Sequence, residues 1–304
     1  MEGLHSDYVS DLQADDRPKA SYENGCTVTA LEEVDGKMKL SFTHKDAGEQ
    51  TCEADLVLAA DGASSTIRRL VAPEVQRKYV GYVAWRGTVP ESALADQAKE
   101  VFVEKFPFFH STGIQALGYL IPGENGTTEP GRRLFNWVWY CNYKDGSLEL
   151  EELMTDTQGK RHAITLPVGS MNPDVWERQK AYAARTLPPQ YAEAVNQTQQ
   201  PFVQAITDVI STQNSFYDGK VLLVGDALAG FRPHTAASTS QAAFHAIYMG
   251  KMFRGRREKV EYDEHVVDYA KRQQEHGVEI GQRSQFERHY WNRDEWEDSD
   301  GESA

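Results

Sequence analysis

The N-terminal part of the chain contains three runs of apolar residues separated by turn sequences. They are CTVTALEEV, KMKLSFTH and CEADLVLAA, at residues 26–34, 37–44 and 52–60. Asp35 and Gly36 lie between the first two runs, and an Asp-Gly pair favours the tight turn of a β-hairpin. The third run ends in LVLAA, which is typical of a strand covered on both faces. We therefore predict a hairpin and a buried strand, then a turn at Asp61 and Gly62 and a helix that begins near Ser64.

After residue 73 the pattern changes to aromatic-rich strands. They are KYVGYVAWRGTVP, GIQALGYLIPG and RRLFNWVWYCNY, at residues 78–90, 113–123 and 132–143. Because side chains alternate along a strand, Phe135, Trp137 and Trp139 point to one face of the last strand. Asn136 and Tyr140 point to the other face, which is more polar. We expect one antiparallel sheet whose aromatic face covers helices, since large aromatics are usually core, and whose mixed face lines a pocket.

The last third of the chain alternates between helical and strand patterns. Residues 172–196 are predicted to be helical, and helices are also predicted over residues 239–253 and 262–289. Between them, FVQAITDVI at residues 202–210 and KVLLVGDA at residues 220–227 are typical of buried strands. These two strands indicate that the chain returns to the first domain after the aromatic sheet.

Composition and charge restrict the classes of partner. The 304 residues are 40% hydrophobic and 11% aromatic, enough for one large domain or two interleaved ones. A net charge of -14 repels a phosphate backbone, so nucleic acid is excluded as a partner. Three cysteines without metal-ligand spacing predict no metal site and a reducing compartment, the cytoplasm. No apolar run is typical of a signal peptide or a membrane span, so we expect no membrane.

Two strand-turn-helix segments carry the candidate chemistry. They are DLVLAADGASSTIRR and GKVLLVGDALAGFRPHTAASTSQAAFHA, at residues 55–69 and 219–246. Each places an acidic residue beside a glycine where a buried strand ends, and ligands of open α/β sheets bind at such ends. The carboxylate can accept hydrogen bonds from sugar hydroxyls, and the following helix N-terminus attracts an anion. One Asp-Gly pair alone is usually only a turn, but the two segments together predict recognition of a ribityl or ribose phosphate.

These residues resemble the single-component FAD-dependent aromatic hydroxylases, in the branch similar to 2,6-dihydroxypyridine 3-hydroxylase. DLVLAADGASSTIRR is similar to the DG motif of that family, and VLLVGDALAGFRPHTAAS is similar to its second FAD motif, including the Arg-Pro-His step. YVAWRGTVPE and LFNWVWY resemble its substrate domain, so the resemblance covers most of the chain. It implies a monooxygenase that uses FAD, NAD(P)H and O2 to hydroxylate an aromatic or heteroaromatic ring.

The resemblance also implies roles for particular residues. Asp226 would bind the ribityl chain of FAD, and Asp61 with Gly62 would lie near the pyrophosphate and the path of NAD(P)H. The backbone of residues 234–238 would border the isoalloxazine ring. The expected cofactor-binding set is Asp61, Gly62, Arg68, Gly225, Asp226, Pro233, His234, Thr235, Ala236, Ala237 and Ser238.

Three residues are candidates for contact with the substrate or for its deprotonation. His234 is the candidate catalytic base for a phenolic substrate, and Arg86 and His110 are weaker ones. The alternative for each is a structural or surface role, since polar groups near strand ends often only satisfy backbone. The substrate pocket is predicted to contain Arg86, Asn136 and Tyr140.

The sequence also departs from the family pattern. It contains no GxGxxG, the turn that in this family receives the FAD pyrophosphate at a helix N-terminus. We therefore expect residues 1–304 alone to hold FAD weakly, and LVLAA and VLLVG to lack sheet neighbours. In the second motif, Ala236, Ser238 and Ser240 replace the common Gly, Gly and Asn, and His245 replaces a common Asp. Alanine at the first of these positions is expected in the dihydroxypyridine-like branch.

The predicted fold class is α/β, an N-terminally truncated FAD/NAD(P)-binding Rossmann-like domain with an inserted antiparallel β-sheet substrate domain. The predicted parts are a partial FAD-binding domain, the substrate domain, the FAD-domain return with C-terminal helices and a disordered acidic tail, at residues 1–72, 73–205, 206–290 and 291–304. Two other functions stay open: a non-catalytic remnant or small-molecule-binding protein of the same fold, and a flavin-dependent oxidase or dehydrogenase. The expected partners are a small aromatic substrate and O2, and a homodimer is one alternative for the oligomeric state.

Overall fold

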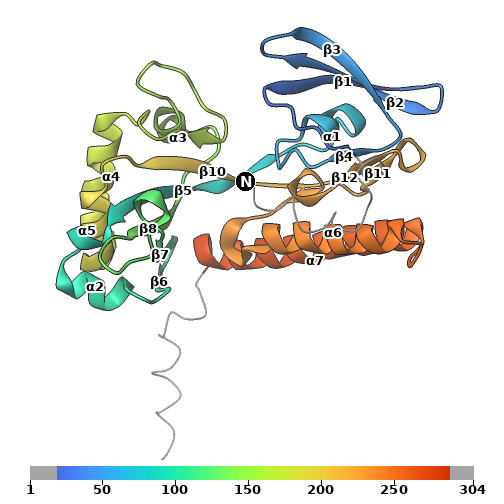
Figure 1. Cartoon of the computed structure of the whole chain (residues 1–304). Helices are drawn as coiled ribbons and strands as arrows, with labels where there is room; N and C mark the ends of the chain where they lie inside the picture. The colour runs from blue at the N-terminus through green and yellow to red at the C-terminus, as the bar shows by residue number, and fades with distance from the viewer. Residues whose placement is uncertain (1–18, 288–304) are drawn as a thin grey trace, which may run out of the picture.

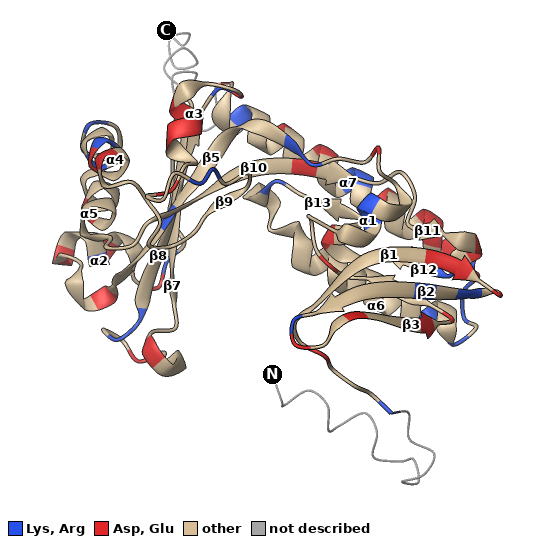
Figure 2. Cartoon of the chain, turned by 90° about the horizontal axis from the view of Figure 1, so that it is seen from above, with Lys and Arg blue, Asp and Glu red and all other residues tan. Residues whose placement is uncertain are grey.

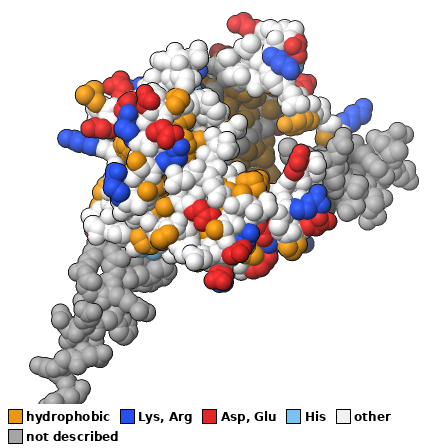
Figure 3. All heavy atoms as spheres, turned by 90° about the vertical axis from the view of Figure 1, so that its left-hand side faces the viewer, with side chains coloured by type: hydrophobic (Ala, Val, Ile, Leu, Met, Phe, Trp, Pro, Cys, Tyr) orange, Lys and Arg blue, Asp and Glu red, His pale blue; other side chains and the backbone are white. Residues whose placement is uncertain are grey.

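The computed structural model of the chain describes residues 19–287. The chain forms two lobes, which β5 (Lys78–Pro90), β10 (Phe202–Ile210) and the long helix α7 (Lys259–Gln285) connect (Figure 1). Basic and acidic residues are interspersed along the elements of both lobes (Figure 2). Seen from the side, the surface is hollowed, and hydrophobic side chains lie within the hollow (Figure 3). The predicted acidic tail at residues 291–304 lies outside the described residues.

The predicted N-terminal hairpin is confirmed. An antiparallel sheet contains β1 (Cys26–Val34), β2 (Lys37–His44) and β3 (Gly48–Ala54). Asp35 and Gly36 have positive φ angles of 49° and 80°, which is the left-handed turn that an Asp-Gly pair adopts at low cost.

The prediction of one strand over residues 52–60 is wrong, because the chain changes sheets within it. β3 ends at Ala54, and β4 (Val57–Ala59) pairs instead in parallel with β12 (Val221–Leu223). β11 (Ser215–Phe216) covers the other edge of β12. In the described part of the chain β4 is therefore an edge strand, whereas β12 has neighbours on both sides. The sequence predicted that both LVLAA and VLLVG would lack sheet neighbours. The prediction holds for β4, which has a neighbour on one side, and fails for β12.

The predicted antiparallel aromatic sheet is present and has seven strands. Its spatial order is β13 (Ala229–Gly230), β10, β5, β8 (Leu134–Asn142), β7 (Ile114–Ile121) and β6 (Phe108–Ser111), and β9 (Thr165–Leu166) also pairs with β10. β10 was expected to belong to the first domain, but Val203 pairs with Trp85 of β5. The predicted boundary at residue 205 thus falls inside a strand of this sheet. β13 lies within the second motif and pairs with β10, which connects that motif to the sheet.

The aromatic face of the sheet is covered by helices, as the alternation of β8 predicts. These helices are α2 (Asp96–Phe102), α3 (Leu148–Leu153), α4 (Pro173–Thr186) and α5 (Pro189–Gln197). Trp176 of α4 stacks on Trp85 and Trp137, with ring centroids 5.7 and 6.5 Å apart. The single helix predicted over residues 172–196 is wrong, since it breaks between α4 and α5. Leu187 is extended because it precedes Pro188, and a residue before proline disfavours the helical conformation.

Two C-terminal helices pack on the smaller parallel sheet. α6 (Ala237–Phe253) and α7 contribute Met249, Tyr262 and Val266 to one buried cluster with Leu223 of β12. This cluster holds the second motif against the rest of its lobe. Within residues 19–287, every helix lacks the combination of length and apolar character that crossing a bilayer requires.

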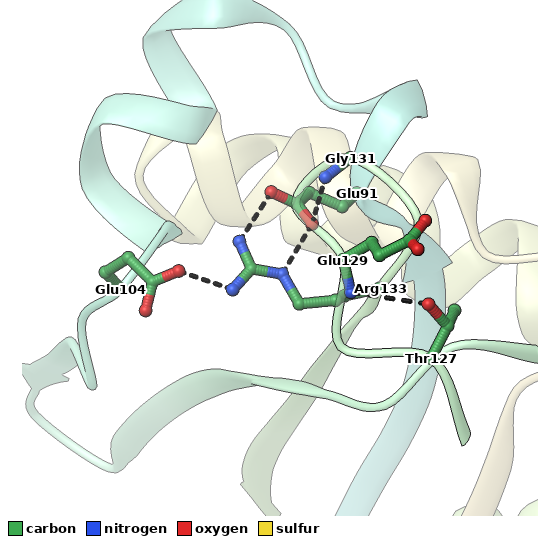
Figure 4. A network of polar contacts seen from close by, with 6 residues as sticks. All are labelled: Glu91, Glu104, Thr127, Glu129, Gly131 and Arg133. Carbon is green, nitrogen blue, oxygen red and sulfur yellow. Dashed lines mark hydrogen bonds and ion pairs between the residues drawn. The ribbon is translucent and has the colours of Figure 1, made fainter.

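An ion pair where β5 ends and β8 begins carries a first testable prediction (Figure 4). The Nε and Nη2 atoms of Arg133 donate to both carboxylate oxygens of Glu91, at 2.8 and 2.9 Å, and Glu91 is 4% exposed. We expect Glu91→Gln to destabilise the fold by about 2 kcal/mol, because charge-assisted hydrogen bonds are lost in a buried site. Urea unfolding at neutral pH measures this difference. Unchanged stability of the variant would contradict a structural role for the pair.

The same ion pair has a definite pH dependence. The hydrogen bonds from Arg133 lower the pKa of Glu91 below the ordinary value of a glutamate. The stabilisation that this ion pair gives the folded state is therefore complete at a pH above the ordinary pKa of a glutamate. It is lost as the pH falls through the lowered pKa of Glu91. The stability difference between the wild type and Glu91→Gln should narrow in acid, and a constant difference down to about pH 3 would contradict the assignment.

Candidate functional site

The two motif segments meet at the same edge of the parallel sheet. β4 and β12 run in parallel with Ala59 opposite Leu223, and the amide of Val224 donates to the carbonyl of Ala59 at 3.0 Å. Parallel strands bring their carboxyl ends together, so the turn at Gly62 lies beside the 3-10 turn η4 (Gly225–Ala227). Residues far apart in the sequence thus form one candidate ligand site.

Two cavities join at Asp226. One has a volume of about 640 Å³ and is lined mainly by apolar residues, among them Leu58 and Met249. The other has a volume of about 390 Å³ and lies between the second motif and the large sheet, with Arg86 on its wall. Asp226, Ser238 and Thr239 line both. The two cavities therefore meet at the wall that carries the Asp226 carboxylate.

The residues at this junction fit FAD. The Oδ1 atom of Asp226 is buried and has no hydrogen-bond partner among residues 19–287, and such an atom is costly unless a ligand donates to it. Gly62 has φ 78°, and a Cβ built on it would meet no atom within 4 Å. A ligand can therefore approach the Gly62 backbone while a ribityl hydroxyl donates to Asp226.

Arg77 also borders the smaller cavity, although no sequence motif identified it. Its Nε donates to Thr207 at 2.6 Å and its Nη1 donates to Ser64 at 2.8 Å. Burial lowers the pKa of Arg77, and the nearby Asp226 opposes part of that change. Arg77 lies between two predicted segments and belongs to no motif, so only the tertiary structure places its positive charge near Asp226.

Two of the predicted cofactor-binding residues use their polar atoms inside the protein. The Oδ2 atom of Asp61 accepts hydrogen bonds from the backbone amides of Thr66 and Ile67, at 2.7 and 3.2 Å. These amides belong to the first turn of α1 (Thr66–Val71). Asp61 therefore caps this helix and shapes the turn at Gly62.

Arg68 has a comparable role between the two motifs. Its side chain is buried, and it donates to the carbonyls of Ala63 and Ala227, at 2.6 and 2.8 Å. Since Ala227 follows Asp226, Arg68 ties the first motif to the second. The guanidinium therefore stabilises the two turns that form the site.

The loop after β13 contains the Arg-Pro-His step and borders the smaller cavity. Pro233, His234 and Thr235 form a 3-10 turn, and Ala236 has a positive φ of 50°. That left-handed conformation explains why the wider family favours glycine here, since an alanine in it costs about 1 kcal/mol. The cavity is lined by Pro233 and by Ala236, Ala237 and Ser238.

His234 is turned toward the mixed face of the large sheet. Its Nε2 atom lies 2.8 Å from the hydroxyl of Tyr82, and its ring centroid is 4.7 Å from that of Tyr140. Burial lowers the pKa of His234 to about 3, with further contributions from Arg232 and His110. The imidazole is therefore neutral at neutral pH. Tyr82 was missed because nothing in its strand pattern separates it from the other aromatic residues.

The remaining predicted pocket residues are only partly brought together. Arg86 lines the smaller cavity, and its charge opposes the rise that burial causes in the pKa of Tyr140. Asn136 lies on the same face of the sheet, but it pairs with Thr88 and Tyr119, four positions along β8 from Tyr140. Arg86, Tyr140 and His234 thus form one group, and Asn136 lies away from it.

His245 supports the second motif at a position where the family commonly has aspartate. Its Nδ1 atom accepts a hydrogen bond from the amide of Gly225 at 2.9 Å, and its side chain is fully buried. Burial lowers the pKa of His245 to about 4, so the neutral ring remains an acceptor at neutral pH. This contact orients the turn that carries Asp226.

The fold and the site are similar to those of known aromatic hydroxylases. A family model described as FAD binding domain-like matches residues 79–208. The 2,6-dihydroxypyridine 3-monooxygenase of Paenarthrobacter nicotinovorans is 33% identical over 201 residues, 66% of this chain and 49% of that relative. The structure of 2,6-dihydroxypyridine-3-hydroxylase from Arthrobacter nicotinovorans has a TM-score of 0.77 and 26% identity, over 85% of this chain and 64% of that chain. Klebsiella pneumoniae HpxO complexed with FAD and uric acid has a TM-score of 0.62 and 19% identity, over 90% of this chain and 60% of that chain.

The chain is thus similar in sequence and in fold to 2,6-dihydroxypyridine hydroxylases. The predicted α/β fold class with an antiparallel sheet is confirmed. The chain spans 49% of the length of the curated dihydroxypyridine relative and 64% of the length of the solved one. The segment that the family model matches runs from β5 into β10, whereas the Asp226 turn lies outside it.

Proposed function

We propose that the chain takes part in FAD-dependent hydroxylation of an aromatic or heteroaromatic ring, with NAD(P)H as reductant and O2 as oxidant. The observation that carries this proposal is the buried, unpartnered Asp226 carboxylate oxygen where two cavities join, one of them beside Arg86. The names of the dihydroxypyridine relatives support a hydroxylated nitrogen-containing or phenolic ring as substrate.

Asp226 would accept a hydrogen bond from a ribityl hydroxyl of FAD, and the backbone at Gly62 and at residues 236–238 would border the cofactor. When bound and reduced, FAD supplies the activation of O2 that ring hydroxylation needs. Arg68, Asp61 and His245 act on this site indirectly, because they hold the two motif turns in place.

The substrate would lie between the second motif and the mixed face of the large sheet. Arg86 provides positive charge for an oxygen of the substrate, and Tyr140 provides an aromatic wall. The neutral His234 provides one donor and one acceptor, and its Nε2 lies against the Tyr82 hydroxyl.

Two exposed free cysteines, Cys26 and Cys52, support a reducing compartment, and we propose the cytoplasm.

The test is to add NAD(P)H and FAD, the latter at a concentration well above its expected weak affinity, to the purified protein and to supply hydroxypyridines and phenols under ¹⁸O2. We expect a flavin absorption spectrum and one ¹⁸O atom in the product. Bound flavin with turnover but without ¹⁸O would favour an oxidase or dehydrogenase. Binding of an aromatic ligand without flavin would favour a small-molecule-binding protein.

The isolated polypeptide of residues 1–304 is expected to bind FAD weakly, with a Kd of roughly 10 μM or more. β4 is an edge strand of the described residues, and the larger cavity beside it has a mainly apolar wall. The site therefore offers a partner for the ribityl chain but no GxGxxG turn to receive a pyrophosphate. Quenching of flavin fluorescence measures the affinity, and tight stoichiometric binding would show the expectation to be wrong.

A further inference from the structure

A buried polar cluster connects the large sheet, the Arg-Pro-His loop and helix α7. Tyr82 is fully buried in β5, and its hydroxyl lies 2.8 Å from Nε2 of His234. Arg232, which is 9% exposed, forms a two-pronged ion pair with Asp208 of β10, through Nε at 3.0 Å and Nη2 at 2.9 Å. Hydrogen bonds at Arg232 and at His234 therefore hold the second motif to the sheet.

Gly281 of helix α7 packs against this cluster. A Cβ built on Gly281 would lie 2.7 Å from the Tyr82 hydroxyl and 3.1 Å from Nη1 of Arg232, so both groups approach the same point on the helix. Nη1 of Arg232 has no hydrogen-bond partner among residues 19–287. Burial raises the pKa of Tyr82, and the charge of Arg232 opposes part of that rise. The Tyr82 oxygen thus faces a positive group that has only donors.

This arrangement determines which ring nitrogen of His234 carries the proton. An oxygen that faces a guanidinium presents its lone pairs to it, and its own hydrogen then points to the other neighbour, Nε2 of His234. A neutral imidazole whose Nε2 accepts must carry its hydrogen on Nδ1. Nδ1 of His234 is buried and has no partner among the described residues, so a ligand acceptor that entered beside the neighbouring Pro233 wall of the smaller cavity would satisfy it.

We propose that Tyr82 and Arg232 hold His234 with its proton on Nδ1, so that His234 donates a hydrogen bond to an ionised oxygen of the aromatic ligand instead of removing its proton. This inference rests on the proposed function of the site. It assigns the ligand a class, an aromatic ring that enters with a deprotonated hydroxyl, for which Arg86 supplies a positive charge. Tyr82 is then a positioning residue, because it acts on the ligand through His234.

The tautomer can be measured without flavin. In protein labelled with ¹⁵N-histidine, long-range proton–nitrogen correlation distinguishes a ring N–H from a bare nitrogen, and His234→Gln identifies the His234 signals. We expect a protonated Nδ1 in the wild type and a change toward a protonated Nε2 in Tyr82→Phe. A protonated Nε2 in the wild type, or no response to Tyr82→Phe, would overturn the inference.

Two glycines of α7 allow the position of the His234 proton to be tested without substitution of Tyr82. Gly281→Ala places a methyl group against the Tyr82 hydroxyl and Arg232, and it should change the tautomer. Gly277→Ala is the control, because its nearest neighbour would be the Arg232 carbonyl at 3.8 Å, an ordinary contact. Equal spectra for the two variants would contradict the part that Arg232 and Tyr82 play.

The ligand class is tested with 4-nitrophenol, which absorbs differently as phenol and as phenolate. We expect the wild type to bind the phenolate, with an affinity about tenfold higher than that of Tyr82→Phe. Binding of the neutral form, or of neither form, would overturn the ligand assignment. If the tautomer and the phenolate preference are found but no ¹⁸O enters a product, the inference stands and the proposed function fails.

Discussion

Asp226→Ala is expected to weaken FAD binding by about ten- to a hundredfold. A hydrogen bond between a carboxylate and a buried hydroxyl contributes roughly 1.5 to 3 kcal/mol, which corresponds to that range. In the structure the Oδ1 atom has no partner within residues 19–287, so its interaction energy is available to the ligand. Fluorescence titration with FAD measures the effect.

The same substitution should change the stability of the ligand-free protein little, because it removes a buried oxygen without a partner and also the negative charge near Arg77. Asp226→Asn is the matched variant, since it keeps the size of the side chain and loses its charge. We expect its affinity to lie between those of the wild type and Asp226→Ala. Unchanged FAD affinity in a folded Asp226→Ala protein would show that the family's role for this residue does not transfer to this chain.

Arg68→Met is expected to destabilise the fold by about 3 kcal/mol and to weaken FAD binding with it. The buried guanidinium satisfies the carbonyls of Ala63 and Ala227, and methionine leaves both without that donor. Because these carbonyls belong to different motifs, the loss also frees the two turns to move apart. Urea unfolding followed by circular dichroism gives the difference in free energy of unfolding.

Arg69→Met is the control for Arg68→Met. Arg69 is the next residue, is exposed, and its side chain donates to the Thr66 hydroxyl of its own helix at 2.9 Å. Its loss should change stability by about 0.5 kcal/mol or less. If both variants unfolded at the same urea concentration, Arg68 would not join the two motifs in solution.

Local signals in the sequence determined much of the fold and the position of the site. The Asp-Gly turn produced the hairpin, because only a few residue types adopt two successive left-handed conformations at low cost. Alternation along β8 predicted which aromatic residues face helices, because the pleat imposes it. The placement of Gly62 and Asp226 at the ends of parallel strands also followed from the sequence, because each motif contains its own strand, turn and helix.

The tertiary structure alone decided which groups are available to a ligand. The residue pattern of β10 is that of any buried strand and does not specify a partner. Its pairing with β5 therefore depended on long-range contacts. Asp61 and Arg68 have the residue types of ligand contacts, but local amides and distant carbonyls use their polar atoms. Arg77 and Tyr82 belong to no motif, and folding places them beside Asp226 and His234. A short sequence pattern determines the conformation of its own backbone, whereas the partners of a side chain depend on contacts between residues more than a hundred positions apart.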